Sequence, residues 1–73
     1  MPKLPVISGK ECLAALRKAG FYELRQRGDH VIMHRDNPST TVSVPLHKTL
    51  KKGTLRAIVR QAGLTVEEFL ELL

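Results

Sequence analysis

The chain has 73 residues, enough for one domain whose hydrophobic core is close to the lower limit for stability. Its single cysteine, Cys12, excludes an internal disulfide framework and is typical of a reducing cytoplasm. The first residues lack the apolar run of a signal peptide, and no segment is long enough to cross a bilayer. We therefore expect a single domain over residues 1–73 of a soluble cytoplasmic protein, with no separate cofactor domain.

Charge is distributed unevenly along the chain. Residues 1–60 contain all 12 lysines and arginines and four of the seven acids, which gives +8, whereas residues 61–73 contain the other three acids and give −3. A basic body indicates an anionic partner, and nucleic acid is the commonest one. With only two phenylalanines and one tyrosine, the composition argues against an extended base-stacking platform. Contacts to phosphates and to backbone shape are therefore favoured.

The first half of the chain reads as a helix followed by a hairpin. Ser8 and Glu11 form a capping-box pattern, and the apolar spacing that follows predicts a helix over residues 9–19. Residues 21–27 and 30–35 alternate as two strands, joined by a turn at Gly28-Asp29. Residues 36–39 form a second turn by composition, because proline fixes φ and Asp or Asn bonds back to its own backbone.

The second half adds a strand and two helices. Residues 40–44 alternate as a third strand, which Pro45 ends. Thr54 is a candidate cap for the next helix, and a second capping box at residues 65–68 opens a short last helix. The order α-β-β-β-α-α predicts an α+β fold, a three-stranded antiparallel sheet with helices on one face. The expected core is Leu13, Leu16, Leu24, Val42, Val44, Leu55, Ile58 and Val59.

His30 is the candidate catalytic residue, because it begins the second strand just after a basic segment. Histidine can accept and donate a proton near neutral pH. Arg25 and Arg27 alternate to one face of the first strand, and guanidinium groups hold phosphates by paired hydrogen bonds. If His30 shares that face, the pattern points to cleavage of an RNA phosphodiester, in which the 2′-hydroxyl is the nucleophile. A solvated surface histidine is the simpler alternative.

The remaining candidate residues follow the third strand. His47 is either a second proton carrier, a phosphate donor or an ordinary loop residue. Lys48, Lys51, Lys52 and Arg56 lie at or before a helix start, where positive charge opposes the helix dipole, so an anionic ligand is a better explanation for them.

The third histidine and the cysteine carry no predicted role in catalysis. His34 lies four residues after His30, about 13 Å away at strand rise, too far to share one phosphate, so it is a bystander or an RNA contact. Three histidines and Cys12 do not form a zinc spacing, so no metal or other cofactor is expected. Cys12 is expected to be a small buried hydrophobe.

Five segments of the chain resemble the HicA family of bacterial toxin–antitoxin modules. The resemblance runs from about residue 7 to residue 69, nearly the whole chain, and the segments that carry it are SGKE at 8–11, KAGF at 18–21, RQRGDH at 25–30, VPLH at 44–47 and KGTLRAI at 52–58. The resemblance implies a fold like that of double-stranded-RNA-binding domains. It also implies an mRNA interferase that cleaves transcripts without a metal and is silenced by a HicB-type antitoxin.

The family's catalytic histidine lies in a Gly-Ser-His motif that matches Gly28, Asp29 and His30, with Asp29 in place of serine. A serine hydroxyl donates to a phosphate oxygen, whereas a carboxylate repels it. The same carboxylate favours the imidazolium form of His30, which can act as a general acid. The resemblance assigns catalysis to His30. Together with the charge pattern of the residues, it leads us to expect RNA contacts at Arg25, Arg27, Gly28, Asp29, His47, Lys48 and Lys52.

Two functional hypotheses remain open, with a third that has less behind it. The first is an endoribonuclease toxin that uses His30 for proton transfer. The second is a non-catalytic double-stranded-RNA-binding module, which Asp29 favours. A domain that binds only protein is supported by nothing except the acidic, leucine-tipped last helix.

Overall fold

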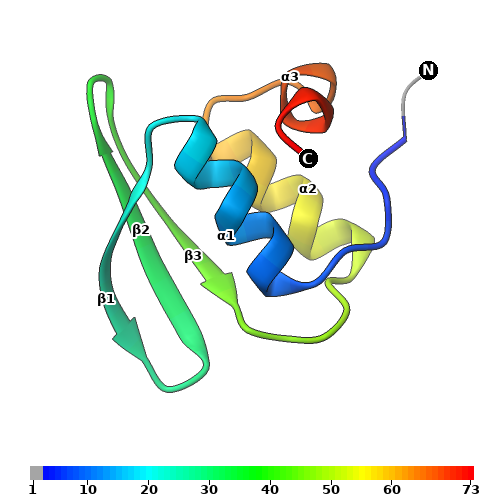
Figure 1. Cartoon of the computed structure of the whole chain (residues 1–73), viewed down its shortest axis with the longest axis horizontal. Helices are drawn as coiled ribbons and strands as arrows, with labels where there is room; N and C mark the ends of the chain where they lie inside the picture. Colours follow the sequence, from blue (N-terminus) through cyan, green and yellow to red (C-terminus); the bar gives the residue numbers. More distant parts are fainter. Residues whose placement is uncertain (1–2) are drawn as a thin grey trace.

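The computed structural model describes residues 3–73, so the first two residues of the predicted domain lie outside the described part. The predicted order of helices and strands is confirmed, and Figure 1 shows the helices on one side of the sheet. The fold is therefore α+β, consistent with the expected likeness to double-stranded-RNA-binding domains. The elements are α1 (Gly9–Lys18), β1 (Tyr22–Arg27), β2 (His30–Asp36), β3 (Ser39–Pro45), α2 (Lys52–Gln61) and α3 (Val66–Glu71).

Both predicted capping boxes are present. At α1, the Ser8 hydroxyl accepts from the Glu11 N–H at 3.1 Å, and the Glu11 carboxylate accepts from the Ser8 N–H at 3.0 Å. Thr65 and Glu68 make the same pair of bonds at α3. These four bonds satisfy backbone N–H groups that a helix start leaves without partners. The boundaries of α1 and α3 therefore follow from local sequence.

The predicted start of α2 is wrong. The helix begins at Lys52, two residues before Thr54, and its N-cap Lys51 makes no side-chain capping bond. The entry to the helix is fixed by tertiary contacts instead. Leu50 is buried in the core, and its N–H donates to the Ile7 carbonyl at 2.8 Å. Because this anchor joins segments far apart in the sequence, a local cap signal does not reveal it.

The sheet is antiparallel in the order β1-β2-β3. β2 and β3 pair without interruption across the turn predicted at residues 36–39. β1 pairs with β2 through a bulge between Glu23 and Arg25. The prediction that Leu24 belongs to the core is wrong, since it is 54% exposed. The bulge leaves Leu24 without a partner on β2, and every residue of this edge strand is exposed.

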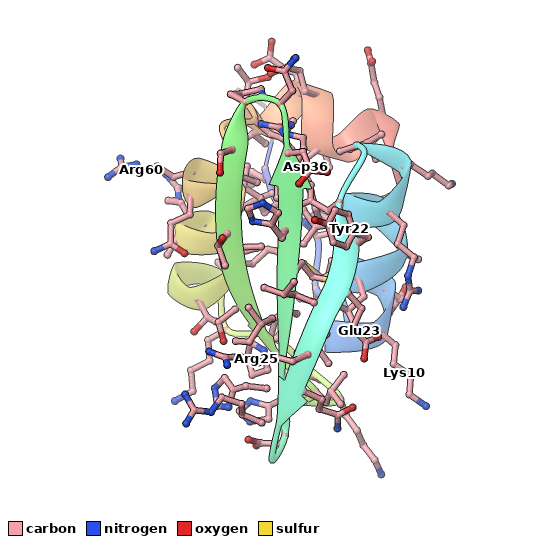
Figure 2. All side chains as sticks on the ribbon, turned by 90° about the vertical axis from the view of Figure 1, so that its left-hand side faces the viewer. Lys10, Tyr22, Glu23, Arg25, Asp36 and Arg60 are labelled. Atoms are coloured by element: carbon pink, nitrogen blue, oxygen red, sulfur yellow. The ribbon has the colours of Figure 1, made fainter. Side chains whose placement is uncertain are left out.

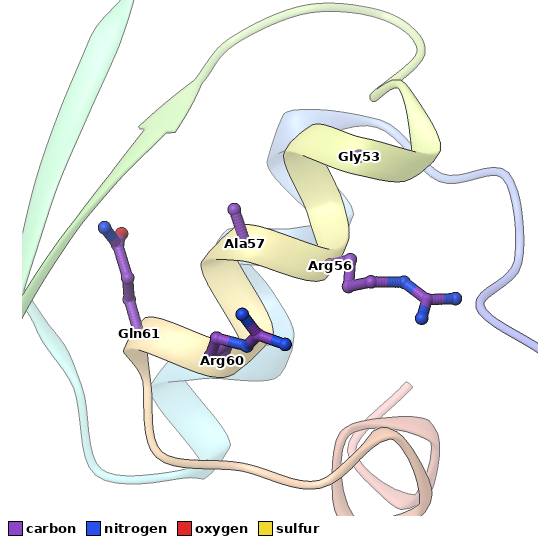
Figure 3. Close-up of a pocket in the computed structure, with 5 residues that line it drawn as sticks. All are labelled: Gly53, Arg56, Ala57, Arg60 and Gln61. Carbon is purple, nitrogen blue, oxygen red and sulfur yellow. The ribbon is translucent and has the colours of Figure 1, made fainter.

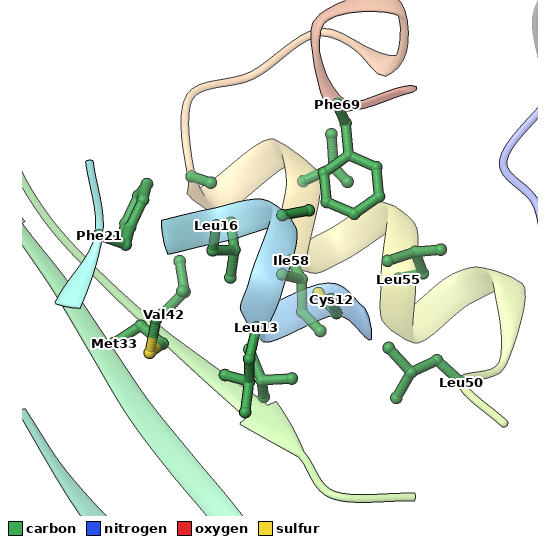
Figure 4. Close-up of a cluster of buried hydrophobic side chains, with 14 of the residues drawn as sticks. Cys12, Leu13, Leu16, Phe21, Met33, Val42, Leu50, Leu55, Ile58 and Phe69 are labelled. Atoms are coloured by element: carbon green, nitrogen blue, oxygen red, sulfur yellow. The ribbon is translucent and has the colours of Figure 1, made fainter. Parts of the chain in front are cut away.

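The core lies between the sheet and the helices (Figure 4). The other seven predicted core residues are buried. Strand β2 contributes Val31 and Met33, and the short α3 adds the fully buried Phe69. Cys12 is buried as expected, and further apolar side chains lie outside the predicted core: Leu4, Ile7, Ala15, Phe21, Leu50 and Ala62. The opposite face of the sheet is left uncovered.

Candidate active site on the uncovered face of the sheet

The pairing register decides which side chains share the uncovered face. Val31 and Met33 of β2 are buried against the helices, so His30, Ile32 and His34 lie on the other side, because strand residues alternate between faces. Residues directly opposite each other in a sheet lie on the same face. Figure 2 looks onto this face.

Both predicted arginines lie on the face that carries His30. Arg27 is the partner of His30, and Arg25 is the partner of Ile32. The bulge at residue 24 precedes both arginines, so their alternation is undisturbed. The condition on which the arginine prediction depended is therefore met: Arg25 and Arg27 share one face of the sheet with His30. Arg25 is labelled in Figure 2, on the strand that faces the viewer.

The turn between β1 and β2 places Asp29 next to His30. Gly28 has φ +59°, a left-handed conformation that side chains disfavour, and its carbonyl accepts from the Gln26 side chain at 3.0 Å. The Asp29 carbonyl accepts from the Leu46 N–H at 2.6 Å. This bond fastens the turn to the segment after β3, the segment that carries His47.

Asp29 joins two imidazoles with its two carboxylate oxygens. Oδ1 lies 2.9 Å from His30 Nδ1, and Oδ2 lies 3.3 Å from His47 Nε2. All three side chains are at least half accessible, with exposed fractions of 50%, 61% and 57% for His30, Asp29 and His47. We call these three residues the histidine cluster. Asp29 contacts Nδ1 of His30 and Nε2 of His47, so it does not engage Nε2 of His30 or Nδ1 of His47.

The electrostatics of the histidine cluster favour a charged carboxylate. The hydrogen bond from His47 is the largest influence, and it lowers the pKa of Asp29 below its ordinary value of 3.8. The charge of His30 acts in the same direction, while partial desolvation acts against it. Asp29 is therefore an anionic acceptor at neutral pH, and it holds each imidazole through the nitrogen that faces it.

The position of His47 is set by the start of α1. The Gly9 N–H donates to the His47 carbonyl at 2.9 Å. Gly9 is buried, and a Cβ atom at this position would overlap the carbonyl oxygen of Pro45 and lie 3.0 Å from Leu46 Cα. Sequence reasoning used residue 9 only as part of a capping box. The one sequence signal for a second role was a glycine in the first turn of a helix, which is weak.

A second polar cluster occupies the other end of the uncovered face. The Tyr22 hydroxyl donates to Asp36 Oδ1 at 2.9 Å, and His34 Nε2 lies 3.3 Å from the same oxygen. His34 Nδ1 lies 2.8 Å from the Thr41 hydroxyl. The rings of Tyr22 and His34 meet edge to face, with centroids 5.7 Å apart. Sequence reasoning left His34 without a fixed role and did not single out Tyr22.

Of the two predicted lysine contacts, Lys48 directly follows His47 of the histidine cluster, whereas Lys52 lies on α2. Lys48 is exposed in the segment between β3 and α2. Lys52 begins α2 and lines a hollow with Lys3, Leu4 and Arg56, not with the histidines. A neighbouring hollow on the outer surface of the same helix is shown in Figure 3; it is lined by Gly53, Arg56, Ala57, Arg60 and Gln61. Lys52, Arg56 and Arg60 therefore form a separate basic surface on α2.

Metal binding, a cysteine nucleophile and a membrane span are three further possibilities that the described residues address. Within residues 3–73, no three or more His, Cys, Asp or Glu side chains are grouped so that they could hold a metal ion. Cys12 is buried as predicted, and burial raises the pKa of its thiol to about 12, so it is not a nucleophile. Over the same residues, none of the helices combines the length and apolar character needed to cross a membrane.

Comparison with known proteins identifies a family for this chain. Residues 9–64 match the family model described as the HicA toxin of bacterial toxin–antitoxin systems. The matched range includes all three members of the histidine cluster, both arginines of β1 and the whole of α2. No curated protein sequence matches the chain.

Proposed function

The chain belongs to the HicA family of bacterial toxin–antitoxin toxins, and from this premise we propose that it is an endoribonuclease that cleaves mRNA through His30. The observation that carries the proposal is the histidine cluster itself. The Asp29 carboxylate orients the imidazoles of His30 and His47. Arg27 is the neighbour of His30 on the adjacent strand β1. The proposed partner is a HicB-type antitoxin that covers this face and blocks access to His30.

The proposed reaction is transesterification within the RNA strand. One imidazole accepts the proton of the 2′-hydroxyl as O2′ attacks the adjacent phosphorus. The bond from phosphorus to O5′ breaks, and the other imidazole gives a proton to O5′. The products are a 2′,3′-cyclic phosphate and a 5′-hydroxyl end. His30 and His47 fit these two roles because each uses one ring nitrogen to contact Asp29 and keeps the other for the substrate.

Asp29 and the arginines have distinct parts in this reaction. With Nδ1–H donated to Asp29 Oδ1, the Nε2 atom of His30 is the one that exchanges a proton with RNA. The carboxylate stabilises the imidazolium that forms when the ring accepts that proton. Arg25 and Arg27 stabilise the negative charge that develops on the phosphate oxygens. The reaction as proposed uses no metal ion or other cofactor.

The test is expression in a bacterial host of the wild-type chain beside His30→Ala. We expect wild type to arrest growth and fragment mRNA, and we expect His30→Ala to cleave at least about 100-fold more slowly, the usual contribution of general acid–base catalysis. His30 is half exposed, so the substitution should change the free energy of unfolding by no more than about 0.5 kcal/mol. Cleavage at the wild-type rate by purified His30→Ala would refute the assignment.

Two variants of Asp29 separate its two possible effects. If the carboxylate mainly orients His30, Asp29→Asn lowers the cleavage rate, because the amide does not stabilise an imidazolium. If it mainly repels the incoming phosphate, Asp29→Ser, which restores the serine of the resemblance, raises the rate. Single-turnover cleavage of one labelled RNA by both purified variants measures the two effects.

The second candidate function is RNA binding without cleavage. The charged Asp29 carboxylate favours it, because Asp29 contacts both imidazoles at the place where a phosphate would have to bind. This function predicts that the purified wild-type chain retards RNA in a gel and gives no product. Its affinity should fall as salt increases, since binding to phosphates releases counterions.

A further inference from the structure

The second polar cluster lies on the same uncovered face as the histidine cluster. His34 is four residues beyond His30 on β2, about 13 Å along the strand. Tyr22 is the cross-strand partner of His34, and Thr41 is its partner on the other side. Three strands thus each contribute one residue to this cluster, and Asp36 at the end of β2 completes it.

The hydrogen bonds of this cluster engage the polar atoms of Tyr22 and His34, and they do not involve the carbon atoms of the two rings. The Tyr22 hydroxyl is bonded to Asp36, while the two nitrogens of His34 are engaged by Asp36 and Thr41. Tyr22 nevertheless remains 43% exposed. What it offers to a ligand is aromatic surface held in one orientation. Figure 2 shows Tyr22 in front of the sheet, below Asp36.

The rest of the face allows a flat ligand to approach. Between the two clusters lies Ile32 on β2, with its partners Arg25 on β1 and Ser43 on β3. The residues of β3 on this face, Thr41 and Ser43, have small side chains. On β1, Arg27 lies opposite His30, and Arg25 lies opposite Ile32 between the two clusters. One face of the sheet therefore carries Arg27 and Arg25, which can bind phosphates, followed along β1 by Tyr22, whose ring can contact a base.

We propose that Tyr22, braced by His34 and Asp36, is a stacking subsite for an unpaired nucleobase of the RNA whose phosphate binds at His30. This inference rests on the proposed function for the site at His30, and it adds the substrate class: single-stranded RNA that extends beyond the cleaved bond. The base belongs to a flanking nucleotide, because His34 is too far from His30 to serve the cleaved nucleotide itself.

The engaged hydrogen-bonding groups also set the kind of recognition. Stacking on an aromatic ring accepts every base, because each base has a π face, whereas discrimination between bases requires free donors and acceptors. The polar atoms of Tyr22 and His34 are already bonded within the protein. The subsite therefore selects RNA by length and by the absence of pairing, with little preference for sequence at that position.

The experiment measures binding with the His30→Ala protein, so that no substrate is cleaved. Short single-stranded RNAs of mixed sequence are extended on the 5′ or the 3′ side of a common core, and affinity is measured by fluorescence anisotropy. We expect Tyr22→Leu to weaken binding at least about fivefold for RNAs extended on one of the two sides, as is usual for loss of one stacked base. Tyr22→Phe, which keeps the ring and loses only the bond to Asp36, should weaken binding much less than Tyr22→Leu.

A direct readout does not depend on substitution. Tyr22 is the only tyrosine of the chain, and the chain has no tryptophan, so its intrinsic fluorescence and its ring proton resonances belong to one residue. Extended RNA should quench the fluorescence and shift the ring protons upfield, and the unextended core should not. This measurement decides the matter even if Tyr22→Leu folds poorly.

The outcomes separate the subsite from the catalytic proposal. Loss of affinity in Tyr22→Leu together with an uncleaved RNA in the wild-type assay would uphold the subsite and overturn catalysis. Equal losses in Tyr22→Phe and Tyr22→Leu would show that the hydroxyl network matters and not the ring, which overturns the subsite. The subsite would also be overturned if Tyr22→Leu bound RNA as tightly as the parent, including the case in which Tyr22→Leu weakens only the binding of an antitoxin.

Discussion

At the scale of single residues, the geometry of the histidine cluster depends on Gly9 as much as on the side chains that form it. Gly9 donates its N–H to the His47 carbonyl and allows the start of α1 to lie against Pro45 and Leu46. Leu46 in turn donates to the Asp29 carbonyl. A side chain at position 9 would push this segment away from α1, and His47 would move with it.

Gly9→Ala should therefore lower both stability and cleavage. We expect the free energy of unfolding to fall by about 1–3 kcal/mol, the usual cost of forcing extra atoms into a packed site. Gly53→Ala is the matched control, because a Cβ at Gly53 meets nothing within 4 Å. Chemical denaturation measures the first effect, and single-turnover cleavage of RNA measures the second. A Gly9→Ala protein as stable and active as Gly53→Ala would contradict this role.

At the scale of elements, Arg35 connects β2 to the end of α2. Its guanidinium donates to the Ala62 carbonyl at 3.1 Å and lies 4.8 Å from the centre of the Phe21 ring. Its Nε atom is buried without a hydrogen-bond partner among the described residues. The positive charge at the C-terminal end of α2 is favourable for the helix dipole, and the packing on Phe21 adds a cation–π interaction.

Replacing Arg35 should loosen the packing between sheet and helix. We expect Arg35→Ala to lower the free energy of unfolding by about 1–2 kcal/mol, because it removes the hydrogen bond to Ala62 and the cation–π interaction with Phe21. Arg35→Lys should cost less, because it keeps the charge and removes the unpaired Nε–H. Urea denaturation of both variants checks the order. An Arg35→Lys protein less stable than Arg35→Ala would mean that the planar guanidinium, and not the charge, stabilises this junction.

The boundaries of helices and strands were predicted correctly where they depend on interactions between residues close together in the sequence. The capping boxes at Ser8 and Thr65 are interactions across three residues, so the sequence contains both partners. The start of α2 and the exposure of Leu24 were predicted wrongly because each depends on a distant segment. Leu50 anchors the helix start to Ile7, and the bulge in β1 exists only in its pairing with β2.

At the scale of the whole molecule, the basic residues divide between two surfaces. Arg25 and Arg27 lie on the uncovered face of the sheet with His30, whereas Lys52, Arg56 and Arg60 lie along α2. If RNA binds on the sheet, only the first group meets phosphates near the cleaved bond. The same face is the one that the proposed antitoxin would have to cover.

The double variant Arg25→Ala with Arg27→Ala tests this division. For a single strand, the slope of log affinity against log salt should become shallower by about 0.7 for each phosphate that the variant no longer neutralises. Lys10→Ala with Arg60→Ala removes the same charge from the two flanks of the molecule in Figure 2 and should leave the slope nearly unchanged. Equal slopes for both doubles would contradict the sheet site, as would an inhibited complex with the antitoxin in which His30 remains accessible.

The sequence by itself determined the order of elements, the basic character of the body and the closeness of His30 to Arg25 and Arg27 along the chain. These features are local, or follow from the two-residue period of a strand, so neighbouring residues suffice to specify them. Only the tertiary structure decided that Asp29 joins His30 to His47, that Gly9 fixes the segment between them, and that Tyr22, His34 and Asp36 meet. Each of these arrangements includes a contact between separate elements, and the number of residues between two positions in the sequence does not determine how far apart they lie in the fold.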